Sequence, residues 1–126
     1  MTMRSPLGRV RGLGSAKEGT DHWYAERLTA LALVPLGLWF VAAVLAGVGA
    51  DYATFKAWMS VPGNMTLMIL LIAVVFRHAA LGLGTVIEDY VHYKPAQRGG
   101  LIAVKFGCIL LGTFSVVSVL KIGLGG

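Results

Sequence analysis

Apolar residues fall in three long blocks along the chain, and each block is long enough to cross a membrane as a helix. The first covers 28–50 without a charged residue, the second about 65–87 and the third about 101–120. A helix needs about 20 apolar residues to cross a hydrocarbon core about 30 Å thick. A helix packed on the core of a soluble protein has a polar face that it turns to solvent, and the first block has no such face. The pattern predicts an all-α membrane protein with three transmembrane helices, because helices satisfy their own backbone hydrogen bonds in lipid.

Glycine, proline and polar residues separate the three blocks and indicate how the chain is organised. We expect residues 1–27 to form a cytoplasmic N-terminal segment and residues 28–126 to form a three-helix transmembrane anchor domain. A short amphipathic stretch is expected around 52–59, between the first and second helices. The transmembrane helices are predicted at about 28–50, 65–90 and 101–122.

Composition excludes several classes of protein. Of 126 residues, 56% are apolar and 13% charged, whereas soluble domains are about 45–50% apolar and about 25% charged. A disordered chain would be richer in charge and poorer in aliphatic residues. The single cysteine, Cys108, excludes a disulfide framework and any cysteine-based zinc or iron–sulfur site within the chain. The net charge of +5 on a mostly apolar chain favours a membrane protein with basic flanks over a nucleic-acid binder.

Basic residues outside the apolar blocks are distributed unevenly between the two sides of the membrane. Seven lie in the N-terminal segment and in the loop after the second block, whereas two, Lys56 and Lys121, lie on the other side. The positive-inside rule therefore predicts a cytoplasmic N-terminus. We expect a multi-pass protein of the bacterial inner membrane. Because the first 16 residues hold three arginines and no acid, as in a transit peptide, the mitochondrial inner membrane is the alternative.

Two residues of the second block, Arg77 and His78, are unusual inside lipid. His78 precedes Asp89 by 11 residues, which is about 16 Å along a helix, so it lies near the middle of the bilayer. A charged side chain there costs about 2.5–3.5 kcal/mol, and such residues are read as functional by default. A neutral histidine can bind haem iron, relay protons or make an interhelical hydrogen bond, and the spacing alone leaves these roles open.

The helix face that carries His78 also carries Leu81, Gly82, Thr85 and Asp89, at helical spacing. Gly82 lacks a side chain one turn from His78, so a flat macrocycle or another helix can approach closely there. A packing stripe with a hydrogen-bonded histidine would show the same pattern. The face therefore indicates close contact with a cofactor or a helix without deciding between them.

The other two histidines, His22 and His92, fall at the cytoplasmic edge, about 15 Å or more from the expected depth of His78. One chain therefore does not readily supply two axial histidines to a haem in mid-membrane. If haem is bound, either the second ligand comes from another subunit or the iron has one protein ligand. Three helices are also little material to enclose a cofactor. Both points predict an obligate partner.

Two stretches of the chain fit a known pattern. Residues 77–92 have a histidine, a run of small residues, and Asp-Tyr-Val at the membrane edge. Residues 21–30 enter the first helix with an arginine shortly before a Thr-Ala pair. These stretches resemble the hydrophobic membrane anchor subunits of succinate dehydrogenase, respiratory complex II. Three helices, the total length and the topology agree with that family over most of the chain.

The resemblance implies that this chain packs with a second three-helix anchor, a cytochrome b subunit. The pair would hold a haem b, with His78 as one axial ligand of the iron and the partner subunit supplying the other. The anchors would dock an iron–sulfur subunit and a flavoprotein subunit, which alone would carry the iron–sulfur clusters and FAD. The chain would have no activity alone, and would help to pass electrons from succinate oxidation to ubiquinone. Membrane lipid is an expected partner and nucleic acid is not.

The resemblance also implies roles for residues near the cytoplasmic edge. Tyr90 would donate a hydrogen bond to a quinone carbonyl, with Asp89 positioning it or serving a proton route. Arg27, with His22 as a weaker candidate, would bind a haem propionate, and Gly82 would allow the macrocycle to approach. The same architecture fits a fumarate reductase.

Two other classes of function stay open from the residues. One is a small proton-coupled transport subunit with a polar path through Arg77, His78 and Asp89. The other is a haem-free structural anchor in which His78 makes only a packing hydrogen bond.

Overall fold

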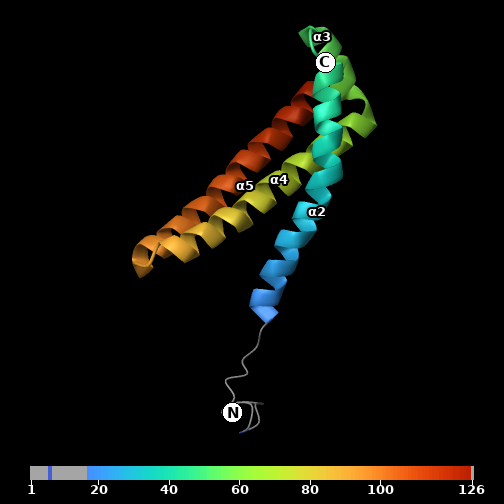
Figure 1. Cartoon of the computed structure of the whole chain (residues 1–126). Helices are drawn as coiled ribbons and strands as arrows, with labels where there is room; N and C mark the ends of the chain where they lie inside the picture. The colour runs from blue at the N-terminus through green and yellow to red at the C-terminus, as the bar shows by residue number, and fades with distance from the viewer. Residues whose placement is uncertain (1–5, 7–16, 126) are drawn as a thin grey trace.

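The structure, a computed structural model, describes residue 6 and residues 17–125. Within this part the chain forms four helices, of which α2, α4 and α5 are long and apolar enough to cross a membrane. This confirms the prediction of three spans in an all-α protein. Figure 1 shows α4 and α5 side by side, α2 crossing α4, and the short α3 near the end of α5. The helices in chain order are α2 (Lys17–Ala46), α3 (Tyr52–Ser60), α4 (Pro62–Tyr90) and α5 (Lys94–Leu124).

The long helices extend beyond the predicted hydrophobic blocks. α2 begins at Lys17 instead of near residue 28 and ends at Ala46 instead of near residue 50, so residues 17–27 are helical and continuous with the first apolar block. α4 and α5 each begin with a proline in the first turn, at Pro62 and Pro95, where a missing N–H is harmless and the fixed φ suits a helix. Hydropathy marks where a helix enters lipid, whereas the hydrogen-bonded helix continues into the polar boundary.

A tight connection joins α2 to α3. Gly49 has a φ of +84°, a left-handed conformation that glycine adopts without steric cost. Asp51 then caps α3 by accepting a hydrogen bond from the Thr54 backbone N–H at 2.8 Å. Hydrogen bonds from Thr54 hold the pKa of the exposed Asp51 carboxyl below its ordinary value. α3 confirms the short amphipathic stretch expected around 52–59.

α4 is the central helix of the fold. α2 and α5 each pack on α4, and within the described residues they do not contact each other. α3 packs on α4 and α5. Glycines of α5 allow close approach to α4, since a Cβ on Gly112 would lie 3.4 Å from the Phe76 ring and one on Gly100 3.4 Å from Ile87. Small residues at helix contacts are typical of membrane bundles, where dispersion replaces the hydrophobic effect.

Few side chains are buried within the described chain. Its buried hydrophobic residues are Met59, Leu71, Leu81 and Val119, and most other large apolar side chains point outward. This inside-out distribution suits a surface that contacts lipid or other membrane subunits. The described residues include no fully buried polar side chain, and part-buried polar side chains meet across the contact of α2 and α4, which carries the candidate site.

Candidate functional site

The centre of the candidate site is a contact between Thr29 of α2 and His78 of α4. Thr29 Oγ1 lies 2.9 Å from His78 Nδ1, and both residues are half-buried. His78 stands 16 residues after Pro62 and 12 before Tyr90 in α4, so it is close to the middle of the span. The structure thus places His78 near the middle of the second candidate span.

A second contact joins the same two helices nearer the start of α2 and the end of α4. The Thr85 hydroxyl donates to the Glu26 carboxylate with an Oγ1–Oε1 distance of 2.8 Å. His22 Nδ1 lies 3.6 Å from the same carboxylate oxygen. The five polar residues along the contact of α2 and α4 form one line, here called the polar seam. Its members are His22, Glu26, Thr29, His78 and Thr85.

The helix face predicted around His78 is confirmed where it meets α2. Leu81 is buried and Thr85 bonds to Glu26 across the contact. A Cβ built on Gly82 would meet no atom within 4 Å, so open space remains one turn from His78. Thr29 and Glu26, which contact His78 and Thr85 from α2, were not predicted as site residues. Their signal in the sequence is the helical spacing of His22, Glu26 and Thr29, which places a polar stripe at the start of an apolar helix.

The two candidate propionate ligands lie differently. His22 belongs to the polar seam, seven residues before Thr29, or about 10 Å along α2. Arg27 is exposed and its guanidinium carbon lies 5.4 Å from the centre of the Trp23 ring, a cation–π contact within α2. Arg27 is two residues from Thr29, so it projects from nearly the opposite face of the helix. Of the two, the structure associates only His22 with the seam.

Arg77 lies apart from the polar seam although it is adjacent to His78 in sequence. Together with Lys105 of α5 it lines a groove of about 410 Å³ between α4 and α5, among small and apolar residues such as Ala80 and Gly112. Consecutive residues of a helix point about 100° apart, as its 3.6 residues per turn require. The structure therefore does not join Arg77 and His78 into one polar path.

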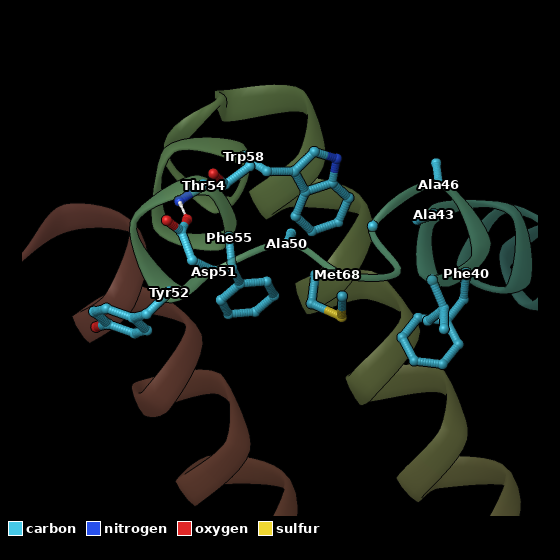
Figure 2. A pocket seen from close by; sticks show the side chains of 12 residues that line it. Phe40, Ala43, Ala46, Ala50, Asp51, Tyr52, Thr54, Phe55, Trp58 and Met68 are labelled. Carbon is cyan, nitrogen blue, oxygen red and sulfur yellow. Dashed lines mark hydrogen bonds between the residues drawn. The ribbon is translucent and has the colours of Figure 1, made fainter.

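Asp89 and Tyr90 occupy the last turn of α4 and are exposed, Tyr90 at 78%. Neither lines the larger pocket, which has a volume of about 520 Å³ and lies around α3. Figure 2 shows its aromatic lining, with Phe55 and Trp58 from α3 and Phe40 from α2. That pocket is at the opposite end of α4 from Asp89 and Tyr90. These two residues are therefore accessible at the end of α4.

Within the described residues, no group of three or more His, Cys, Asp or Glu side chains converges as a metal-binding cluster. A metal held at His78 would need ligands that this part of the chain does not bring to it. A macrocycle with its own four nitrogens and a histidine from a second subunit would meet that need.

Comparison with known proteins decides the family. The succinate dehydrogenase/fumarate reductase transmembrane subunit family matches residues 1–114. The chain belongs to this family. The anchor residues discussed above, from His22 to Tyr90, all lie within the matched range.

Curated relatives carry the same description. The chain is 32% identical to the succinate dehydrogenase hydrophobic membrane anchor subunit of Rickettsia bellii, over 92% of this chain and 93% of the relative. It is 28% identical to the protein of that description from Paracoccus denitrificans, over 96% of this chain and 93% of the relative. No solved structure gives a significant match.

These findings make the chain a membrane anchor subunit of a succinate dehydrogenase or fumarate reductase. With three apolar spans and bacterial relatives over nearly its full length, it is a multi-pass protein of the bacterial inner membrane. The anchor subunit belongs to an oxidoreductase complex.

Proposed function

We propose that this anchor subunit uses His78 as one axial ligand of a haem b, with a second anchor, a cytochrome b subunit, supplying the other ligand. It thereby helps electrons from succinate oxidation to reach ubiquinone. The observation that supports this most is the placement of His78. The ring lies in mid-span on α4, is held by Thr29 through Nδ1, and stands one turn from the open space at Gly82.

The residues around His78 fit a haem. Histidines that bind metals almost always engage their second ring nitrogen in a hydrogen bond, and Nδ1 of His78 is engaged in this way. Nε2 is then the nitrogen available to iron, and Gly82 leaves room beside it. His22, and Arg27 after a change of rotamer, are the proposed propionate partners, since cationic donors suit a carboxylate. When bound, the haem supplies a one-electron carrier in mid-membrane.

The last turn of α4 is the proposed contribution to a quinone site. Reduction of a quinone takes two electrons and two protons, and negative charge develops on its carbonyl oxygens. The Tyr90 hydroxyl can donate a hydrogen bond to such an oxygen, and the exposed position of Tyr90 supports this role. Asp89, the preceding residue, would position the phenol or exchange protons with water. The remaining walls of this site would come from partner subunits.

The proposed partners are the second anchor, an iron–sulfur subunit and a flavoprotein subunit. The outward apolar surface of all three spans supports docking against further membrane helices. FAD and the iron–sulfur clusters would reside in the partner subunits, and succinate would be oxidised there. The cytoplasmic face, at the Tyr90 end of α4, is the proposed docking side because seven of the basic residues outside the apolar blocks flank it.

A reduced-minus-oxidised visible spectrum of the complex, purified through a tag on this chain, tests the ligand proposal. We expect a b-type band in the wild type that is lost or shifted in His78→Leu. Arg77→Leu is the matched control, because Arg77 is adjacent in sequence but lines the groove toward α5, and its spectrum should equal that of the wild type. A band unchanged by His78→Leu would contradict the ligand role. Co-purifying flavin without any haem would favour a haem-free structural anchor.

Tyr90→Phe tests the quinone proposal separately. Loss of one hydrogen bond, about 1.4 kcal/mol, should slow succinate-dependent quinone reduction about tenfold. Succinate oxidation by a soluble artificial acceptor should not change, because that reaction takes place on the flavoprotein side. Tyr93→Phe is the control, since Tyr93 is an equally exposed tyrosine three residues further on. Equal quinone reduction by Tyr90→Phe and the wild type would contradict the proposal.

A further inference from the structure

We infer that Thr29 selects the tautomer of His78. Its hydroxyl oxygen accepts the Nδ1–H proton of the ring, which leaves the lone pair of Nε2 free to bind iron. This inference rests on the proposed ligand role of His78 and adds a positioning residue on a different helix. Thr29 has no contact of its own with the haem in this proposal, and acts only through the histidine.

The hydrogen bonds around Thr29 carry the argument. Its Oγ1 lies 2.8 Å from the carbonyl oxygen of Ala25 and 3.0 Å from that of Glu26, both in its own helix. Carbonyl oxygens only accept, so these contacts use the single hydroxyl proton of Thr29. The oxygen then faces His78 Nδ1 at 2.9 Å with lone pairs only. A hydrogen bond at that distance requires the proton to be on Nδ1.

Two other hydroxyl side chains show the same preference, whereas that of Thr85 lies 3.1 Å from Leu81 O and also donates to the Glu26 carboxylate, which can only accept. Thr66 donates to Pro62 O at 2.7 Å and Ser118 to Phe114 O at 2.8 Å, the bonding to a carbonyl four residues earlier that helical Ser and Thr commonly adopt. Within lipid this arrangement keeps the hydroxyl proton paired whatever the neighbouring helix does. The hydroxyl oxygen of Thr29 therefore acts as a hydrogen-bond acceptor toward His78 of α4.

The opposite arrangement is incompatible with ligation through Nε2. If Thr29 donated to Nδ1, a neutral imidazole would carry its one proton on Nε2, which then has no lone pair for a metal. The observed geometry thus prepares the histidine before any haem arrives. The Nδ1–H to oxygen bond also fixes the rotation of the ring and raises its basicity as a ligand.

Three variants of the whole purified complex separate this role from simple packing. Thr29→Val keeps the shape but removes the acceptor, whereas Thr29→Ser keeps the hydroxyl. Thr85→Val is the matched control, because it breaks the other hydrogen bond between α2 and α4 without touching His78. The readouts are the haem-to-flavin ratio, the electron paramagnetic resonance of the ferric haem, and the haem midpoint potential.

Thr29→Val should weaken haem affinity about 10- to 100-fold, as loss of a partner of a ligating histidine does. It should also shift the midpoint potential to more positive values, because a less basic imidazole stabilises ferric iron less. Thr29→Ser should restore all three readouts, and Thr85→Val should match the wild type. If Thr29→Val does not assemble, the smaller Thr29→Ala, which also lacks the acceptor, should show the same shift.

Two results would overturn the inference while leaving the proposed function intact. One is a haem that disappears in His78→Leu but keeps wild-type content, resonance and potential in Thr29→Val and Thr29→Ala. The other is an equal change in Thr85→Val and Thr29→Val, which would assign the effect to a loosened helix contact. A wild-type complex with flavin and no haem would instead contradict the proposed function, and the inference with it.

Discussion

The Thr85 hydroxyl donates to the Glu26 carboxylate across the membrane helices α2 and α4, with 2.8 Å between Oγ1 and Oε1. The bond joins residues 59 positions apart in the chain and lies beside the bond between Thr29 and His78. Among the described helices α2 packs mainly on α4, and it also reaches α3 where Trp39 stacks on Trp58. The two interhelical hydrogen bonds help to set how α2 is rotated against α4, because they need specific donor and acceptor positions.

Loss of the bond between Thr85 and Glu26 should lower the stability of the subunit. We expect both Thr85→Val and Glu26→Met to destabilise it, and a double-mutant cycle to give a coupling energy of about 0.6 kcal/mol and at most about 1.7 kcal/mol, the range for hydrogen bonds in membrane proteins. The coupling energy is measured by unfolding the detergent-solubilised complex in increasing concentrations of dodecyl sulfate.

Thr66→Val is the control for that cycle. Thr66 is exposed near the start of α4 and its hydroxyl donates to Pro62 O of its own helix. Thr66→Val should therefore show no coupling with Glu26→Met. Strict additivity of Thr85→Val and Glu26→Met would contradict the importance of the bond.

Local pattern was enough to predict the three spans, the short helix around 52–59 and the position of His78 near the middle of its helix. Each depends on hydropathy or spacing within one segment, and α4 indeed places His78 in mid-span. The ends of the helices were less accurate, since α2 begins at Lys17 and α5 at Lys94. Polar residues extend a helix beyond lipid as readily as they begin a loop, so hydropathy does not locate the end.

The partners of His78 could not be predicted from spacing alone. That Thr29 faces it depends on which helix packs against α4 and on the rotation of α2, and both are properties of the assembled bundle. The rotation of α2 also decides which of the two propionate candidates, His22 or Arg27, faces α4. The resemblance favoured Arg27 over His22 as a propionate ligand, and that stays a prediction. The packing of α2 places His22 on the seam and Arg27 against Trp23.

Gly123 should be intolerant of a larger side chain. A Cβ at this position of α5 would contact Met65 and would lie 3.0 Å from the backbone oxygen of Met59 in α3. Met65 can move aside, whereas the α3 backbone cannot do so cheaply. Gly123→Ala should therefore destabilise the complex by about 1–3 kcal/mol, as overpacking does, and lower its thermal midpoint in detergent.

Gly107→Ala is the matched control on the same helix, because a Cβ there meets no atom within 4 Å. Its thermal midpoint should be unchanged or slightly higher, since alanine is the better helix former. Equal midpoints for the two alanine variants would contradict the close contact of α5 with α3.

Asp51 should make the start of α3 sensitive to acid. Hydrogen bonds from Thr54 hold the pKa of this carboxyl below its ordinary value of 3.8. A carboxyl with a lowered folded pKa stabilises at pH values above its unfolded pKa, and this stabilisation is lost as the pH falls through the folded pKa. Amide exchange in α3, corrected for its intrinsic rate, should therefore accelerate below about pH 4, close to the ordinary pKa of Asp.

Asp51→Asn separates this titration from general acid effects, because asparagine caps a helix without ionising. Its exchange in α3 should show no such step. A step of the same size in Asp51→Asn and the wild type would assign the acid sensitivity to another group.

The orientation of the chain gives a prediction that is independent of any cofactor. An odd number of spans puts the end of α5 on the opposite side from the start of α2, and the basic residues place that start in the cytoplasm. Alkaline phosphatase, which folds only in the periplasm, should be active when fused after residue 126. It should be inactive when fused after Tyr93, in the connection between α4 and α5. A green fluorescent protein fused at the same two points should give the reverse pattern. Phosphatase activity at Tyr93 together with fluorescence at residue 126 would show the opposite orientation. Asp89 and Tyr90 would then lie on the side away from the proposed docking face.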